Sequence, residues 1–356
     1  MPPTTTTATT AANQFRRIGK GFCGSVWALE IADPSDPDYH RAIKRGDGGP
    51  DRSISNDFKM HRLILDTCTM PALVPRCYQL VDETDTDWWA ARAYRFPSDY
   101  KPCTSVVSEH IPPFSQRIRE QLLDAFCPEQ PISCSCPKQT IDCPCPKTLK
   151  EFVKTNPADE DCLVRPYLGR RRRHAPPKSD SEERPTRFQR FSLRNYPLHI
   201  DQIETLGLDA LAYARTMAST LATMHWSAQV EANDVEFVLA PARAGHGGEI
   251  FVSQGLGTHT MWILDFDCCR SISTDATGVA QACDAFLQNN PFYPRPASTT
   301  AADESLWSAF RERFLEASRE IVGEDGEREG LPGMLVTLIE ERGAELRKRK
   351  DAIIGD

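Results

Sequence analysis

The chain has 356 residues, of which 40% are hydrophobic and 26% charged, and its formal net charge at pH 7 is −8. This length allows one large core or two lobes, and the acidic balance excludes a general nucleic-acid coat protein, which needs positive charge to displace phosphate counterions. The 13 cysteines are too few for a disulfide scaffold, and no run approaches the roughly 20 apolar residues of a membrane helix. The N-terminus also lacks a basic segment followed by an apolar run, so we expect a cytoplasmic protein without membrane or DNA partners.

The N-terminal third has the pattern of a small β-rich lobe. Residues 1–13 form a Thr/Ala-rich segment that cannot bury apolar surface, which predicts a disordered tail. Across residues 14–115, short runs of branched and aromatic residues alternate with Gly, Pro and Asp clusters. This pattern predicts a helix at residues 55–65, with Asn56 and Asp57 as caps near its start, and strands at residues 25–31, 40–44 and 88–94.

The strongest local motif in this lobe is a glycine run, in which Gly19, Gly21 and Gly24 have the spacing G-x-G-x-x-G. Such glycines let a hairpin turn bring backbone N–H groups close to a phosphate. The run continues as a strand instead of opening a helix, and Lys44 follows about 20 residues later, as in protein kinases. A dinucleotide-binding fingerprint and an ordinary glycine hairpin are the alternatives. Lys44 is expected to point into a cleft and pair with Asp57, unless it is a surface lysine on an edge strand.

Residues 116–350 have the pattern of a larger helical lobe. Apolar residues recur every three or four positions from Leu208 to Met224, which predicts a buried central helix. A strand at residues 261–266 and two amphipathic helices near residues 306–314 and 334–339 complete the pattern. The predicted fold class is therefore α+β, a protein-kinase-like two-lobed fold with a small β-rich N-terminal lobe and a larger helical C-terminal lobe.

Two insertions interrupt this lobe, a Cys/Pro-rich insert at residues 127–146 and a basic loop at residues 169–187. Four cysteines of the insert are candidate zinc ligands, although the C-x-C spacing is atypical and reduced cysteines in a loop are the alternative: Cys134, Cys136, Cys143 and Cys145. Four arginines of the basic loop are candidate contacts for the phosphates of an RNA ligand, with a solvated loop or a localisation-type patch as the alternative: Arg170, Arg171, Arg172 and Arg173.

A cluster of carboxylates replaces the catalytic loop of a kinase, whose motif is H-R-D-x-x-x-x-N before a short strand. Alignment of the strand puts Glu231 at the position of the base and Glu236 at that of the metal-binding Asn. Asp265 lies in Leu-Asp-Phe-Asp, which is similar to Asp-Phe-Gly with Asp267 in place of the glycine. Together with Asp234, these residues are expected to line one cleft. Because clustered carboxylates repel one another, they imply a cationic ligand, either a metal or a guanidinium. A merely solvated loop is the alternative.

Several segments together resemble a fungal family whose members are often described automatically as zinc-finger-like proteins of unknown function. The segments lie between residues 15 and 325, at residues 162–170, 191–198, 224–226, 234–239 and 262–266. Members of this family include arginine-containing cyclodipeptide synthases, which join arginine and a second amino acid, both delivered on tRNA, into a diketopiperazine. The resemblance implies that arginyl-tRNA and a second aminoacyl-tRNA are partners, and that the acidic motif around Asp234 and Glu236 carries the activity.

The synthase needs a base that frees an α-amine and groups that stabilise an oxyanion at each aminoacyl ester. The expected catalytic residues are Glu231, Asp234, Glu236 and Asp265. The expected ligand-binding residues are Gly19, Gly21, Gly24, Lys44 and Asp267. A covalent intermediate would need a Ser or Cys beside the base, and the sequence identifies none. The alternatives are a kinase-fold phosphotransferase, which would use Mg-ATP, and a non-catalytic kinase-like binding module. Zinc is the one other candidate cofactor.

Overall fold

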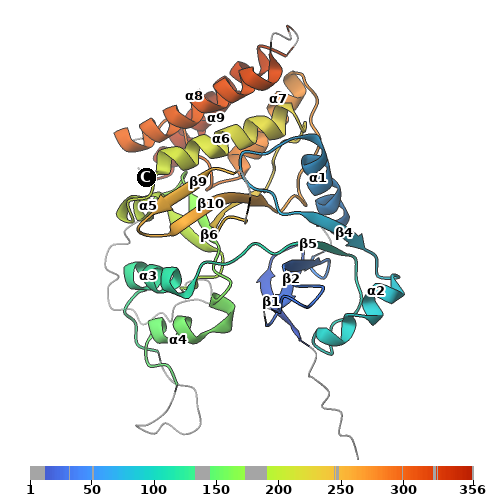
Figure 1. Cartoon of the computed structure of the whole chain (residues 1–356). Coiled ribbons are helices and arrows are strands. Elements are labelled where there is room, and N and C mark those ends of the chain that lie inside the picture. Colours follow the sequence, from blue (N-terminus) through green and yellow to red (C-terminus); the bar gives the residue numbers. More distant parts are fainter. Residues whose placement is uncertain are drawn as a thin grey trace, which may run out of the picture.

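The computed structural model describes residues 13–31, 33–49, 52–132, 145–172, 191–243, 245, 248–298, 300–323, 326 and 328–354. In this part of the chain, α-helices and two five-stranded sheets form a mixed α+β fold (Figure 1). The predicted N-terminal tail, except Asn13, most of the Cys/Pro-rich insert and most of the basic loop lie outside the described residues. The fold class α+β is therefore confirmed.

The first sheet comes from the N-terminal third and has the strand order β1-β2-β3-β5-β4, with every neighbouring pair antiparallel. Its strands are β1 Phe15–Lys20, β2 Ser25–Leu29, β3 Arg41–Arg45, β4 Cys77–Val81 and β5 Ser105–Glu109. The predicted strands at residues 25–31 and 40–44 correspond to β2 and β3. The glycine run forms the turn between β1 and β2.

The strand predicted at residues 88–94 is wrong, because this segment forms the short helix α2 (Thr86–Ala90) followed by a single turn at Ala93–Arg95. Asp85 precedes α2, and its side chain accepts a hydrogen bond of 3.1 Å from the backbone N–H of Trp88. This N-cap satisfies a free donor of the first turn, which favours helix over strand. Of the aromatic residues that suggested a strand, Trp88 and Trp89 pack instead against the core of the first sheet, where Trp89 is buried beside Phe96, while Tyr94 is exposed.

Helix α1 (Ile54–Thr67) follows β3 and confirms the predicted helix, but not its predicted caps. Ser53 is the N-cap, and its side chain accepts a 3.1 Å hydrogen bond from the backbone N–H of Asn56. Asn56 lies within the first turn, and its side-chain amide donates 2.9 Å hydrogen bonds to the carbonyl oxygens of Asp267 and Cys269. The residues expected as caps therefore connect α1 to the C-terminal half.

The second sheet lies in the C-terminal part, which is less purely helical than predicted. Its strand order is β7-β6-β8-β10-β9, in which only β6 and β7 are parallel. Its strands are β6 Val164–Tyr167, β7 Tyr196–His199, β8 Glu236–Ala240, β9 Ile250–Ser253 and β10 Gly257–Leu264. The sequence predicted β10 and, through the alignment to the kinase motif, the strand at residues 237–239 that corresponds to β8, but not β6, β7 and β9, which have four residues each. Strands this short carry little periodicity.

Helices cover one face of the second sheet, in the upper part of Figure 1. The helices in this upper part are α6 Ala210–Trp226, α7 Ala276–Gln288, α8 Ala301–Val322 and α9 Leu331–Ile354. Helices α3 Gln116–Phe126 and α4 Leu149–Thr155 lie in the lower part of the figure, and α5 Ile200–Thr205 directly follows β7. Helix α6 is buried along most of its length and belongs to the same core as α1, α3 and α8, through residues such as Ile64, Leu122, Met217 and Phe314. None of the described helices is long and apolar enough to cross a membrane.

The two sheets are joined by backbone pairing. Leu73 donates a 2.8 Å hydrogen bond to the carbonyl of Met261 in β10 and accepts one of 2.8 Å from Ile263. This bridge and the Asn56 contacts hold the first sheet and α1 over the ends of β8 and β10. The predicted boundary between residues 115 and 116 falls between β5 and α3, and it stays a prediction.

Candidate functional site

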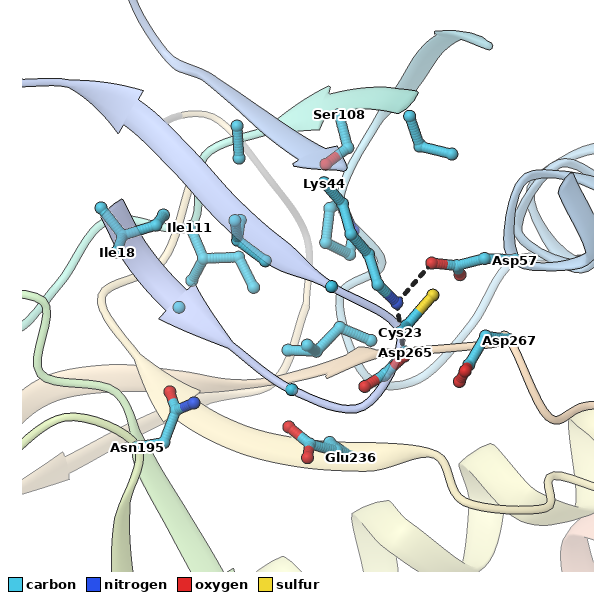
Figure 2. Close-up of a pocket in the computed structure, with 18 of the residues that line it drawn as sticks. Ile18, Cys23, Lys44, Asp57, Ser108, Ile111, Asn195, Glu236, Asp265 and Asp267 are labelled. Carbon is cyan, nitrogen blue, oxygen red and sulfur yellow. Dashed lines mark hydrogen bonds and ion pairs between the residues drawn. The ribbon is translucent and has the colours of Figure 1, made fainter. Parts of the chain in front are cut away.

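A pocket of about 360 Å³ is lined by residues of both sheets (Figure 2). This volume is in the range of small-molecule sites, roughly 300–1,000 Å³. Among the described residues that line it are four Lys or Arg side chains and seven carboxylates, namely Asp57, Glu109, Asp161, Asp234, Glu236, Asp265 and Asp267. Asp161 and Glu109 pair with Arg16 and Arg243, which lie outside the lining, so five carboxylates face four cations. The remaining small excess of negative charge favours a cationic ligand.

The glycine turn forms one wall, and all three predicted glycines line the pocket. Gly24 has a φ of 151°, and a Cβ at this position would lie 1.9 Å from the carbonyl oxygen of Arg45. Two N–H groups of the turn are already engaged, because Gly21 donates to the Gly24 carbonyl (2.8 Å) and Ser25 to the Asp47 carboxylate (2.7 Å). A carboxylate so close to the turn opposes a phosphate there.

Lys44 of β3 lies at the centre of the pocket (Figure 2). Its Nζ donates to Asp57 Oδ2 of α1 at 2.6 Å, as predicted, and to Asp265 Oδ1 at 2.5 Å. Burial disfavours the charged amine, but Asp265 and Asp57 together hold the pKa of Lys44 well above its usual value. Burial likewise opposes ionisation of Asp265, yet Lys44 keeps the pKa of Asp265 below its usual value. The group is therefore an ionised triad.

Glu236 is the first residue of β8, and Arg165 projects from the neighbouring strand β6. Arg165 Nη2 donates to Glu236 Oε2 at 2.5 Å. Burial raises the pKa of Glu236 to about 7, although Arg165 opposes this shift. Because its pKa is close to neutral, the Glu236 carboxyl group can both accept and return a proton under physiological conditions.

The predicted residues Asp234 and Asp267 converge on a cation that the sequence did not identify, Arg52. Its Nη1 lies 2.7 Å from Asp234 Oδ2, 3.2 Å from Asp267 Oδ2 and 2.6 Å from Cys268 Sγ. The guanidinium also stacks over the ring of Phe22 at 5.7 Å, at the tip of the glycine turn. Burial and the nearby Asp265 raise the pKa of Asp267 to about 6.

The same three side chains, Asp234, Asp267 and Cys268, are the group of described residues whose ligand atoms could hold a metal ion. Arg52 Nη1 contacts all three and so fills the position that an ion would need. Two carboxylates and one thiol are also not the four Cys or His ligands of a structural zinc site. The described residues therefore do not fit a zinc ion here. Of the predicted zinc ligands, only Cys145 lies within the described residues.

Glu231, predicted as a catalytic base, does not reach the pocket. Its side chain is buried and accepts a hydrogen bond from Gln281 of α7. The loop between α6 and β8 takes left-handed conformations at Gln229 and Ala232, with φ of 54° and 61°, on either side of this residue. These reversals separate Glu231 from Asp234 and Glu236, although all three lie in one short motif. The expectation that Glu231 lines one pocket together with Asp234 and Glu236 is therefore wrong.

The basic run has a different environment from the one expected. Arg171 donates to Glu204 (2.7 Å) and Asp303 (2.6 Å), and Arg172 pairs with Asp201 at 2.8 Å. Arg170 is exposed, and Arg173 lies outside the described residues. No described residue of the run lines the pocket. Arg171 and Arg172 therefore stabilise contacts between β6, α5 and α8.

Two side chains with nucleophilic atoms line the pocket, Cys23 and Ser108. Burial raises the pKa of the Cys23 thiol to about 12, so the thiol is protonated at neutral pH and is not an activated nucleophile. No histidine or carboxylate base is hydrogen-bonded to Ser108 among the described residues. The pocket therefore favours direct transfer over a covalent enzyme intermediate.

Sequence reasoning missed several polar residues of the pocket, among them Arg52, Arg165 and Asn195. The last two fall in segments that carry the family resemblance, residues 162–170 and 191–198, so these segments held the available signal. Arg52 had no such signal, because its partners Asp234 and Asp267 are about 200 residues away in the chain.

The fold and the pocket together define an α+β protein that has a carboxylate-rich pocket between its two sheets. Residues 261–326 match a family model described as "Zinc finger protein". The match covers under a fifth of the chain and includes Asp265 and Asp267. It contains three cysteines and no histidine, and Cys269 and Cys283 are buried, so the described residues there do not form a zinc finger. No curated protein and no solved structure matches the chain.

Proposed function

We propose that the chain is a tRNA-dependent cyclodipeptide synthase that forms cyclo(Arg-Xaa) from arginyl-tRNA and a second aminoacyl-tRNA. One observation carries this proposal, namely that the acidic pocket holds a guanidinium. The Arg52 side chain is bound by Asp234 and Asp267 and covered by Phe22. Paired carboxylates and an aromatic face are the contacts that the side chain of an arginyl substrate requires. The resemblance to arginine-containing cyclodipeptide synthases supports the same substrate.

The carboxyl group of Glu236 provides the base for this reaction. An α-amino group has an ordinary pKa of about 7.7–8.0. Glu236, with a pKa of about 7, is well matched to remove a proton from such an ammonium group near neutral pH. The amine then attacks the ester carbonyl of the other aminoacyl-tRNA. The nitrogen releases its second proton to solvent as the amide forms, and Glu236 returns the first proton to the leaving ribose oxygen, so the enzyme ends each transfer unchanged.

The second candidate is a phosphotransferase with a protein-kinase-like two-lobed fold. The glycine turn and the contacts of Lys44 with Asp57 and Asp265 favour this fold. Three features disfavour phosphoryl transfer. Glu231 is turned away from the pocket, Glu236 is paired with Arg165, and Asp47 binds the glycine turn. A kinase needs a base at the position of Glu231 and a metal ligand at the position of Glu236. The synthase is therefore the better supported function.

The decisive experiment supplies the purified chain with total tRNA, aminoacyl-tRNA synthetases and isotope-labelled arginine. Mass spectrometry then searches for a labelled diketopiperazine. We expect a labelled product that disappears when ribonuclease is added beforehand. Two glutamates of one loop give a matched pair: Glu236→Gln abolishes the product, whereas Glu231→Gln keeps it. A folded wild-type protein that gives no product with any charged tRNA would refute the proposal.

Mg-ATP tests the second candidate in the same preparation. Ligand binding to the folded state raises the melting temperature, by an amount that grows with the logarithm of the ligand concentration above Kd. The synthase proposal expects no change in melting temperature with Mg-ATP. A rise that Lys44→Ala abolishes would favour the phosphotransferase instead.

A further inference from the structure

Two residues without an assigned role, Arg165 and Asn195, lie beside Glu236 in the pocket. Strands β6 and β7 are parallel, and their register places Val164 opposite Tyr196. The two residues are therefore neighbours at the same end of adjacent strands, where both line the pocket. Figure 2 shows the Asn195 amide directed into the pocket on the side of Glu236.

The guanidinium of Arg165 has one N–H donor without a hydrogen-bond partner among the described residues. Its Nη2 is bound to Glu236, but its Nε is buried and has no hydrogen-bond partner among the described residues. Burial disfavours the charge, yet Glu236 keeps the pKa of Arg165 above its usual value. Because buried N–H groups are nearly always paired, an unpaired donor in a pocket indicates that an acceptor is missing.

Asn195 has a left-handed backbone conformation immediately before β7. Its φ is 51°, and the next residue, Tyr196, donates a 2.8 Å hydrogen bond to the Leu163 carbonyl. Asn adopts this conformation more readily than most residues with a side chain. The side-chain amide donates no hydrogen bond to any other residue that the structure describes, so its donors are available to a ligand of the pocket.

We propose that Arg165 and Asn195 form the oxyanion site of this pocket, and that its ligand is the carbonyl oxygen of an aminoacyl ester. This inference rests on the proposed function. In each transfer, the α-amine forms the new C–N bond and the carbonyl oxygen becomes negatively charged. The guanidinium and the amide stabilise this charge as donors, while Glu236 holds the proton of the amine. The C–O bond to the ribose then breaks, and the ribose oxygen takes the proton from Glu236.

In this arrangement, Arg165 contacts Glu236 and Glu236 can still act as the base. The base and the oxyanion donors must both come within about 3 Å of the groups on which they act. Arg165 touches the base through Nη2 and leaves Nε for the substrate, so one side chain positions both groups. The ring-closing transfer uses the same residues a second time, because it is also an attack of an amine on an ester.

The test compares Asn195→Gly with the wild-type enzyme, using arginyl-tRNA and a second aminoacyl-tRNA as substrates. Glycine removes the amide but accepts the left-handed backbone, so the variant is expected to fold. Loss of one oxyanion donor should lower kcat by about 10²–10³-fold with little change in KM. His40→Gly is the matched control, because His40 is also left-handed, with a φ of 64°, but is exposed and outside the pocket. It should keep wild-type kcat.

Arg165 is tested by its pH profile. The groups that act on Glu236 are Arg165 of β6, Lys44 of β3, and the carboxylates of Asp265 and Asp234. Arg165 lowers the pKa of Glu236, so Arg165→Gln should both reduce kcat and move the acid limb of the rate profile to higher pH. Arg165→Lys keeps the charge without Nε, and should retain the wild-type acid limb while losing kcat.

The outcomes separate the two proposals. If the wild-type enzyme makes cyclo(Arg-Xaa) and Asn195→Gly retains its kcat, the oxyanion site is wrong and the proposed function stands. An unshifted acid limb together with full activity in Arg165→Gln would have the same meaning for Arg165. If the wild-type protein makes no cyclic dipeptide, the proposed function fails and the oxyanion site fails with it.

Discussion

Replacement of Glu236 by Gln should make the protein more stable at alkaline pH while it abolishes the activity. Burial raises the pKa of Glu236 from its ordinary value of 4.5 to about 7. Between these values the folded state keeps a proton that the unfolded state has lost, so the free energy of unfolding falls as pH rises through this window. At about 1.4 kcal/mol for each pH unit, the ionised carboxylate lowers stability by about 3 kcal/mol above pH 7.

The Gln side chain imitates the protonated carboxyl group and can still accept the hydrogen bond from Arg165. The difference in stability between Glu236→Gln and wild type should therefore be close to zero near pH 4.5, and about 3 kcal/mol in favour of the variant at pH 8. Urea denaturation at both pH values measures this difference, in which the other titrating groups cancel. A variant that is less stable than wild type at pH 8, or a difference that does not change with pH, would refute the reasoning.

Glu231→Gln should change the stability of the protein but not its activity. Burial raises the pKa of Glu231 to about 7 as well, so its replacement should give the same pH-dependent stabilisation. Because Glu231 lies outside the pocket, the Glu231→Gln variant should keep forming product. Loss of product in both variants would mean that the effect of Glu236 is not specific to the pocket.

Three further outcomes follow from the contacts of the pocket. Gly24→Ala should lower the free energy of unfolding by on the order of 2 kcal/mol in urea denaturation, because its Cβ would meet the Arg45 carbonyl in a strained conformation, whereas Gly21→Ala should have little effect. Arg52→Ala frees two carboxylates, so agmatine should bind several-fold more tightly in calorimetry; weaker binding would argue against a guanidinium site. Lys44→Met leaves the buried Asp57 and the half-buried Asp265 without their cation and should destabilise the fold by about 3 kcal/mol, while an unchanged urea midpoint would contradict the role of Lys44 as their shared cation.

The parts of the fold that sequence reasoning found are those with a local signal. The glycine turn and the helix α6 have a fixed spacing or a sustained period, and the pair of Lys44 and Asp57 follows from the order of a known motif. The same reasoning failed where a local pattern was ambiguous. At Trp88 and Trp89, aromatic residues suggested a strand, but the cap at Asp85 and packing against the core of the first sheet produced a helix.

The parts that it missed depend on contacts between distant segments. The parallel pairing of β6 and β7 joins two four-residue strands across an insertion, and strands this short show no alternating pattern from which the pairing could be predicted. Arg52 reaches Asp234 and Asp267 only after the two sheets have packed. Glu231 shows the converse problem, because alignment to a motif cannot detect the left-handed residues that turn it towards α7.

Strand β6 has a consequence for how salt should affect this protein. Its residue Arg165 lines the pocket and pairs there with Glu236, whereas the chain just beyond the strand carries Arg171 and Arg172, which pair with their own carboxylates. The side chains of Arg171 and Arg172 are more exposed than that of Arg165. Because salt screens exposed charges most strongly, added salt should weaken the ion pairs beyond the strand more than the ion pair inside the pocket.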